Sequence, residues 1–116
     1  MRRASCALVQ ASKRIELAIP EQSTALQRRE LNAIARYCVR RVEDTLGAPD
    51  HWSMRVGSVD QGMFACTVVV HDGGCAIETT STEADGGLAI WAAVREVGQV
   101  LRDVRASRSW RARRAA

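Results

Sequence analysis

The first long amphipathic segment of the chain predicts a helix over about residues 23–46. Its apolar residues recur at spacings of three and four, and they are Leu31, Ile34, Ala35, Cys38 and Val42. Thr24 and Gln27 stand three residues apart at its start, which is the spacing of a capping box. Gly47 and Pro49 follow its end, where glycine and proline typically stop a helix.

A second segment, over about residues 86–106, has the clearest helical repeat in the sequence. Its apolar residues follow one another at intervals of four, three, four and three, and they are Ile90, Val94, Val97, Leu101 and Val104. Asp85 precedes this segment and can cap its first turn. The pattern then fades into an arginine-rich stretch. We therefore predict a single α+β domain over residues 1–106 and a basic, mobile C-terminal tail over residues 107–116.

Between the two helices, three short segments have the patterns of strands. Residues 52–59 alternate apolar and polar side chains, residues 63–70 are almost continuously apolar, and residues 75–82 are rich in threonine. Residues 60–62 read as one turn, and the Asp72-Gly73 pair is the strongest hairpin signal in the chain.

The stretch before the first helix contains two short apolar runs. One spans residues 7–9 and the other residues 15–19, and at least one of them should be a strand that ends at Pro20. The predicted order is therefore β-α-β-β-β-α. We expect a two-layer α+β sandwich with an antiparallel-rich sheet, both helices on one face and the other face open to solvent or to a partner.

Positive charge is distributed unevenly along this chain. The net charge is +4, from sixteen Arg, one Lys and thirteen acidic residues. Residues 1–47 carry +4, residues 48–94 carry −5 and residues 95–116 carry +5. The basic ends coincide with the predicted helices, which favours phosphate recognition by guanidinium groups. A codon bias toward arginine is the other explanation, and the total charge does not choose between them.

The arginines of the two helices are the candidate binding residues. Arg29, Arg36 and Arg40 stand seven and four residues apart, which places them on one stripe of the first helix. Arg95 and Arg102 lie one heptad apart on the second helix, and Arg105 and Arg108 continue that outer surface. Together they predict a broad basic surface suited to a phosphate backbone. The full set is Arg29, Arg36, Arg40, Arg41, Arg95, Arg102, Arg105 and Arg108.

The sequence offers no pattern for catalysis or for a metal or cofactor. His51 and His71 are the only histidines, and no motif places a nucleophile beside either. The Gly86-Gly87 pair opens a helix but lacks the Lys-Ser/Thr sequel of a phosphate loop. We expect a protein that is not an enzyme and has no cofactor, no metal and no small-molecule substrate. Trp91 is expected to pack at the edge of the second helix.

The cysteines and the N-terminal segment indicate in which cellular compartment the protein is expected. None of Cys6, Cys38, Cys66 and Cys75 forms a C-x-x-C pair, and we expect reduced, mostly buried thiols in a cytoplasmic protein. A single disulfide joining Cys66 to Cys75 across a hairpin remains the alternative. The apolar run after Met1 is short and is interrupted by Lys13, so we expect neither an export signal nor a membrane span.

Residues 66–104 combine several features in a fixed order. They are the apolar strand 66–71, the turn Asp72-Gly73-Gly74, the strand of small and polar residues 75–82, Asp85, and the helix 88–104. This order resembles the ribosome hibernation promoting factor family, also called sigma-54 modulation proteins. The residues that carry the likeness within the helix are Ala89, Ile90, Leu101, Arg102 and Arg105, and Arg36, Arg40 and Arg41 fit the first helix of the family. Gly87 stands where the family usually has an aromatic residue.

The resemblance implies a fold like that of double-stranded-RNA-binding domains. It also implies binding to ribosomal RNA on the small ribosomal subunit, in the channel where messenger and transfer RNA meet, and inhibition of translation by occlusion. An alternative hypothesis is a non-catalytic protein-interaction module that forms a homodimer through its exposed sheet face. The two differ in salt dependence, because phosphate binding weakens steeply with added salt.

Overall fold

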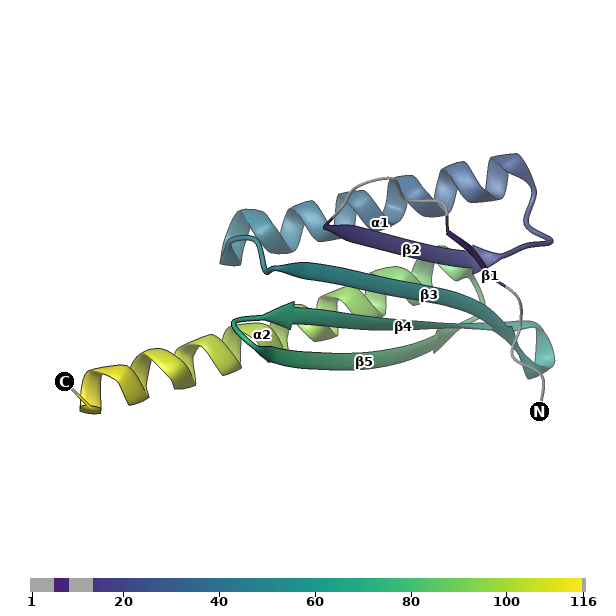
Figure 1. Cartoon of the computed structure of the whole chain (residues 1–116). Coiled ribbons are helices and arrows are strands. Elements are labelled where there is room, and N and C mark those ends of the chain that lie inside the picture. The colour runs from purple at the N-terminus through teal and green to yellow at the C-terminus, as the bar shows by residue number, and fades with distance from the viewer. Residues whose placement is uncertain (1–5, 9–13, 116) are drawn as a thin grey trace.

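The computed structural model describes residues 6–8 and 14–115, which fold into a five-stranded sheet and two long helices (Figure 1). The strands are β1 (Cys6–Leu8), β2 (Ile15–Pro20), β3 (His51–Val59), β4 (Met63–Asp72) and β5 (Cys75–Glu83), and the helices are α1 (Ala25–Leu46) and α2 (Gly86–Ala115). The predicted α+β class and the order β-α-β-β-β-α are confirmed. Both apolar runs before α1 are strands, and β1 adds a further strand at the edge.

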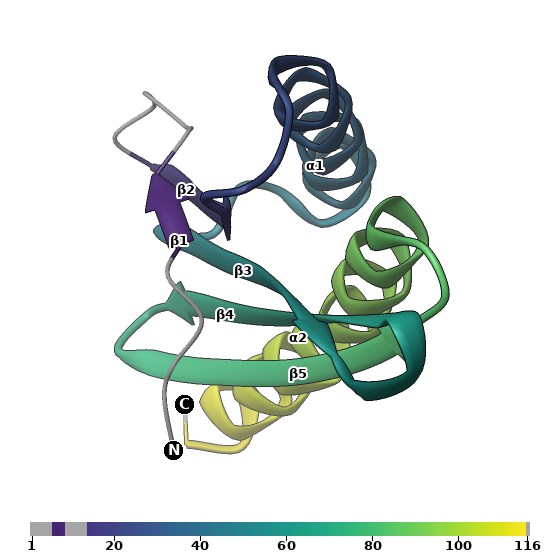
Figure 2. The same ribbon diagram turned by 90° about the vertical axis from the view of Figure 1, so that its right-hand side faces the viewer.

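The sheet is mixed, with the strands in the order β1-β2-β3-β4-β5. Neighbouring strands are antiparallel except for β2 and β3, which are parallel because α1 carries the chain back across one face. Both helices cover that same face, as predicted, and none of the residues that the structure describes forms a helix on the opposite face (Figure 2). The core lies between the two layers and contains Leu17, Trp52, Val68, Ile90 and Leu101, each with a fully buried side chain.

Local signals fix the ends of α1 where the sequence predicts them. The Thr24 hydroxyl accepts a hydrogen bond from the backbone N–H of Gln27, and the Gln27 side chain accepts one from the backbone N–H of Thr24. These two bonds satisfy donors that the first turn leaves without partners. Gly47, at a φ of 81°, ends the helix. One further bond holds α1 over the sheet, because Trp52 donates its indole N–H to Glu43 at 3.0 Å.

α2 begins as predicted but ends later. Asp85 caps its first turn by accepting a hydrogen bond from the backbone N–H of Leu88 at 3.2 Å. The predicted end near residue 106 is wrong, since the helix continues to Ala115 and takes in most of the expected tail. The segment after Gly98 contains no glycine or proline and is rich in alanine and arginine, which favour helix. The last turns of α2 reach beyond the end of the sheet (Figure 1).

The β4–β5 hairpin turns on Gly73 and Gly74, whose φ angles are 57° and 82°. Two successive residues with positive φ make the tight turn that suits the twist of a hairpin. The register pairs Cys66 with Ser81, far from Cys75 at the turn. The alternative prediction of a Cys66–Cys75 disulfide is therefore wrong. Cys38, Cys66 and Cys75 are free thiols. Burial raises the pKa of Cys66 to about 12, which keeps that thiol protonated.

Candidate functional site

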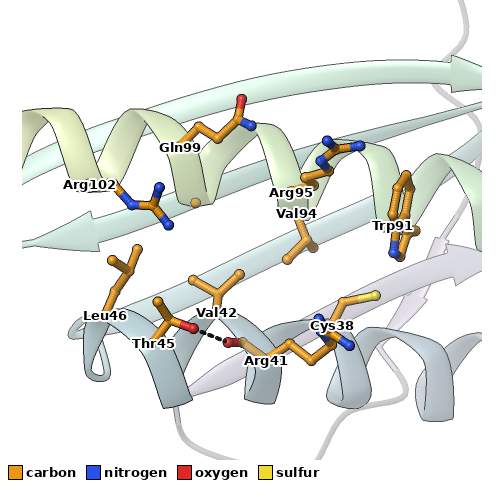
Figure 3. A pocket seen from close by; sticks show the side chains of 11 residues that line it. Cys38, Arg41, Val42, Thr45, Leu46, Trp91, Val94, Arg95, Gln99 and Arg102 are labelled. Carbon is orange, nitrogen blue, oxygen red and sulfur yellow. Dashed lines mark hydrogen bonds between the residues drawn. The ribbon is translucent and has the colours of Figure 1, made fainter.

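A groove of about 400 Å³ runs between α1 and α2 on the outer side of the helical layer. Three of the predicted arginines line it: Arg41 from α1, and Arg95 and Arg102 from α2 (Figure 3). The remaining lining residues are Cys38, Val42, Thr45, Leu46, Trp91, Val94, Gly98 and Gln99. None of these eleven lining residues carries a carboxylate. The groove therefore has a positive rim without an acidic neighbour in its wall.

Helical spacing explains why these side chains converge. Trp91, Arg95, Gly98 and Arg102 follow one another at intervals of four, three and four, which places them along one stripe of α2. Gly98 lets the two helices come close, because a Cβ added there would lie 3.2 Å from a Val42 methyl carbon. Such a distance is tighter than ordinary van der Waals contact. The missing side chain thus sets how closely the two arginine-bearing walls approach each other.

Aromatic rings hold two of the three groove arginines in place. The guanidinium carbon of Arg41 lies 5.9 Å from the centre of the Tyr37 ring, and Arg41 also donates to the Tyr37 hydroxyl at 3.2 Å. That of Arg95 lies 5.2 Å from the centre of the Trp91 ring. Within the described part of the chain, neither of them nor Arg102 forms an ion pair with a carboxylate. Their charge is available to an outside anion.

The other arginines predicted on α1 lie outside the groove. Arg29, Arg36 and Arg40 are exposed, as the stripe predicts. Because an α-helix turns about 100° per residue, that stripe faces away from the side of α1 that carries Arg41. The structure brings Arg41 together with Arg95 and Arg102, and leaves the remaining α1 arginines on a separate surface.

Contrary to the sequence prediction, Arg105 and Arg108 do not extend an open outer surface. Both turn toward Asp72, whose relative exposure is only 8%. The Asp72 carboxylate accepts two hydrogen bonds from Arg105 and one from Arg108, each at 3.1 Å. We call this set of three residues the Asp72 clamp. Their role in RNA binding stays a prediction, while their intramolecular partners are plain in the structure.

The clamp joins three elements through backbone as well as side chains. Arg105 also donates to the carbonyl of Leu46 and, at 3.3 Å, to that of Gly47. Arg108 donates to the backbone carbonyl of Asp72 at 2.8 Å. The hydrogen bonds from Arg105, with a further contribution from Arg108, hold the pKa of Asp72 below its ordinary value. Arg105 thereby links the end of α1 to the β4–β5 hairpin and α2, and Arg108 adds a second link between the hairpin and α2.

A second hollow, of about 570 Å³, adjoins the groove toward the start of α2. Its lining is mostly apolar and consists of Ala33, Ile34, Tyr37, Cys38, Asp85, Gly87, Leu88 and Trp91. Cys38 and Trp91 line both hollows, so the two meet there. Trp91, which the sequence predicts to pack at the edge of the second helix, is 46% exposed. The sequence analysis does not predict this hollow, because its residues come from both helices and from the turn before α2.

No helix of the described residues is both long and apolar enough to cross a bilayer. Comparison with models of known protein families finds no match, and no curated protein shows significant sequence similarity to the chain.

Proposed function

We propose that the protein is an RNA-binding factor that associates with the small ribosomal subunit, occludes its decoding channel and inhibits translation. The observation that carries the proposal is the convergence of Arg41, Arg95 and Arg102 on one groove between the two helices. The resemblance of residues 66–104 to the ribosome hibernation promoting factors supplies the ribosome as the partner. The helices-on-one-face architecture is the one that this resemblance implies.

The chemistry of the groove suits phosphate oxygens. A guanidinium group presents several N–H donors in a plane, and it can donate two of them to one phosphate. Donors from two helices, separated by a groove, can follow a backbone in which successive phosphates repeat along the strand. Each phosphate that is neutralised releases counterions, so most of the affinity would come from a salt-sensitive term that is independent of base sequence.

Inhibition by such a protein needs no covalent step. A folded domain that fills the channel excludes messenger and transfer RNA by its volume, and the basic groove anchors it to the surrounding ribosomal RNA. Approach through the helical layer also keeps the exposed acids of the open sheet face away from the RNA. Glu16 and Glu78 alternate with buried residues on their strands, so they face the open side of the sheet.

The test is co-sedimentation with purified small ribosomal subunits at low and at high salt. The wild-type protein should pellet at low salt and leave the subunit at high salt. An Arg95→Gln/Arg102→Gln variant removes two groove charges, and an Arg29→Gln/Arg40→Gln variant removes two exposed charges outside the groove. Pelleting should be lost in the first and largely retained in the second.

Two results would overturn the proposal. If the wild-type protein stays in the supernatant at low salt, ribosome association is wrong, and a protein-interaction module that uses the open sheet face becomes the better hypothesis. If both double variants lose binding equally, the groove is not the contact surface and total charge alone drives the association.

A further inference from the structure

The apolar hollow beside the arginine groove is unusual for a surface that binds only phosphates. Its exposed aromatic and aliphatic side chains are Tyr37, Leu88 and Trp91, with relative exposures of 58%, 54% and 46%. Large apolar side chains rarely gather on a solvated surface unless something covers them. A phosphate backbone, which is charged and strongly hydrated, has nothing to gain from contact with these groups.

We propose that this hollow receives one unpaired nucleobase, stacked on Trp91, while the neighbouring groove arginines hold the phosphate attached to it. The inference rests on the proposed function, since it names the kind of RNA that the same surface recognises. A base supplies a flat apolar face, and its phosphate supplies the negative charge that the adjacent groove lacks. Both are linked by one ribose, which matches the continuity of the two hollows at Trp91 and Cys38.

The polar groups at the rim of the hollow suit the edge of a base. Apart from the Cys38 thiol and the indole N–H of Trp91, the polar side-chain groups in its lining are the Tyr37 hydroxyl and the Asp85 carboxylate. A carboxylate accepts hydrogen bonds, as Asp85 already does from Leu88, and a phenol can donate or accept. Exocyclic amino and carbonyl groups of bases are partners for both. The volume of about 570 Å³ lies in the range of small-ligand sites, roughly 300–1,000 Å³.

Stacking also sets the form of RNA that can bind. Bases in a duplex are paired and covered on both faces, so none can enter the hollow without being unstacked. Bases in single-stranded loops, bulges and ends are free to stack on an aromatic side chain. The site should therefore prefer single-stranded RNA to a duplex of the same length, although the duplex carries more phosphate charge. An occupant of another class, such as an acidic peptide with apolar side chains, is an outcome that the test distinguishes.

The experiment compares three RNA probes in fluorescence titrations at low salt. They are a decameric oligoadenylate, a fully abasic strand of the same length, and a ten-base-pair duplex. Trp110→Phe serves as the background, since Trp52 is fully buried and the remaining exposed indole is Trp91. Binding of the intact single strand should quench Trp91 emission. The abasic strand should bind at least about fivefold more weakly, the lower end of the effect of one base–aromatic stack.

A matched pair of variants in the same background isolates stacking from apolar packing. Trp91→Leu keeps an apolar side chain but removes the ring, so affinity should fall and the preference for the intact over the abasic strand should disappear. Trp91→Phe retains a ring and should keep that preference. Because Trp91→Leu removes the emission signal, affinities of both variants are measured by anisotropy of labelled RNA, and circular dichroism confirms folding.

The outcomes separate the two levels of inference. If intact, abasic and duplex RNA bind equally and Trp91→Leu changes nothing, the base site is wrong while phosphate binding by the groove stands. If no RNA binds, and small subunits do not bind either, the proposed function is wrong as well. If an acidic peptide that contains leucine and phenylalanine quenches Trp91 and RNA does not, the occupant is a protein segment and the base site is overturned.

Discussion

Two pairs of arginines on neighbouring turns of α2 have opposite surroundings. Arg95 and Arg102 stand exposed at a groove whose wall contains no carboxylate. Arg105 and Arg108 are partly buried and share the carboxylate of Asp72. The same residue type, spaced along one helix, thus stabilises the fold in one place and leaves charge for a partner in the other. Helical phase and the position of one hairpin make the difference.

The largest expected effect comes from removing equal charge from the two pairs. Arg95→Gln/Arg102→Gln should weaken binding to single-stranded RNA about tenfold or more at low salt and lower the log–log salt slope by about 2. Arg105→Gln/Arg108→Gln should change the affinity by less than about threefold, because those groups already have partners. Anisotropy titrations at four salt concentrations measure both. If both variants lose the same affinity for RNA, the groove and clamp arginines do not differ in binding, and total charge determines the affinity.

For the stability of the fold we expect the reverse order: loss of the clamp should matter more than loss of the groove arginines. Asp72→Asn leaves two arginines beside a neutral group, and we expect the free energy of unfolding to fall by about 1–2 kcal/mol. The Arg95→Gln/Arg102→Gln variant should stay within about 0.5 kcal/mol of the wild type, as is usual for exposed substitutions. Urea denaturation gives both values. A wild-type midpoint in Asp72→Asn would show that the clamp contributes nothing to stability.

The clamp should also make stability depend on pH in a defined direction. Its arginines lower the pKa of Asp72 in the folded state relative to the unfolded state. The ionised carboxylate therefore stabilises the fold above the ordinary aspartate pKa, and this contribution disappears as the pH falls toward the lowered value. The stability difference between wild type and Asp72→Asn should be constant near neutral pH and shrink below about pH 4. A difference that persists at pH 2 would contradict this assignment.

The smallest effect concerns the hairpin turn on which Asp72 depends. Gly73 and Gly74 both have positive φ, so alanine at either position is strained by about 1 kcal/mol. A Cβ at Gly73 would also lie 2.9 Å from a guanidinium nitrogen of Arg108, whereas one at Gly74 meets no atom within 4 Å. Gly73→Ala should therefore melt at a lower temperature than Gly74→Ala. Equal melting temperatures would mean that Arg108 moves aside at no cost.

Features set by neighbouring residues were predictable from the sequence, and those set by distant contacts were not. The bounds of α1 follow from Thr24, Gln27 and Gly47, which act within one turn of the helix ends. The clamp joins Asp72 to residues 33 and 36 positions later, and no local pattern indicates such a pairing. The sequence predicts the arginines of the two helices as one set. Their division into groove and clamp depends on how α2 lies against α1 and the hairpin, which spacing alone does not specify.

Because Arg105 donates to the end of α1, that end of the helix can be completed only after residue 105 has been synthesised. The last carbonyls of a helix have no partner within it. Here the donor that reaches the Leu46 carbonyl comes 59 residues later in the chain. A nascent chain that has already produced α1 and the whole sheet still lacks that donor. We expect the C-terminal turn of α1 to exchange its amide hydrogens rapidly in a chain truncated after residue 104, and to become protected only when the remaining turns of α2 are present.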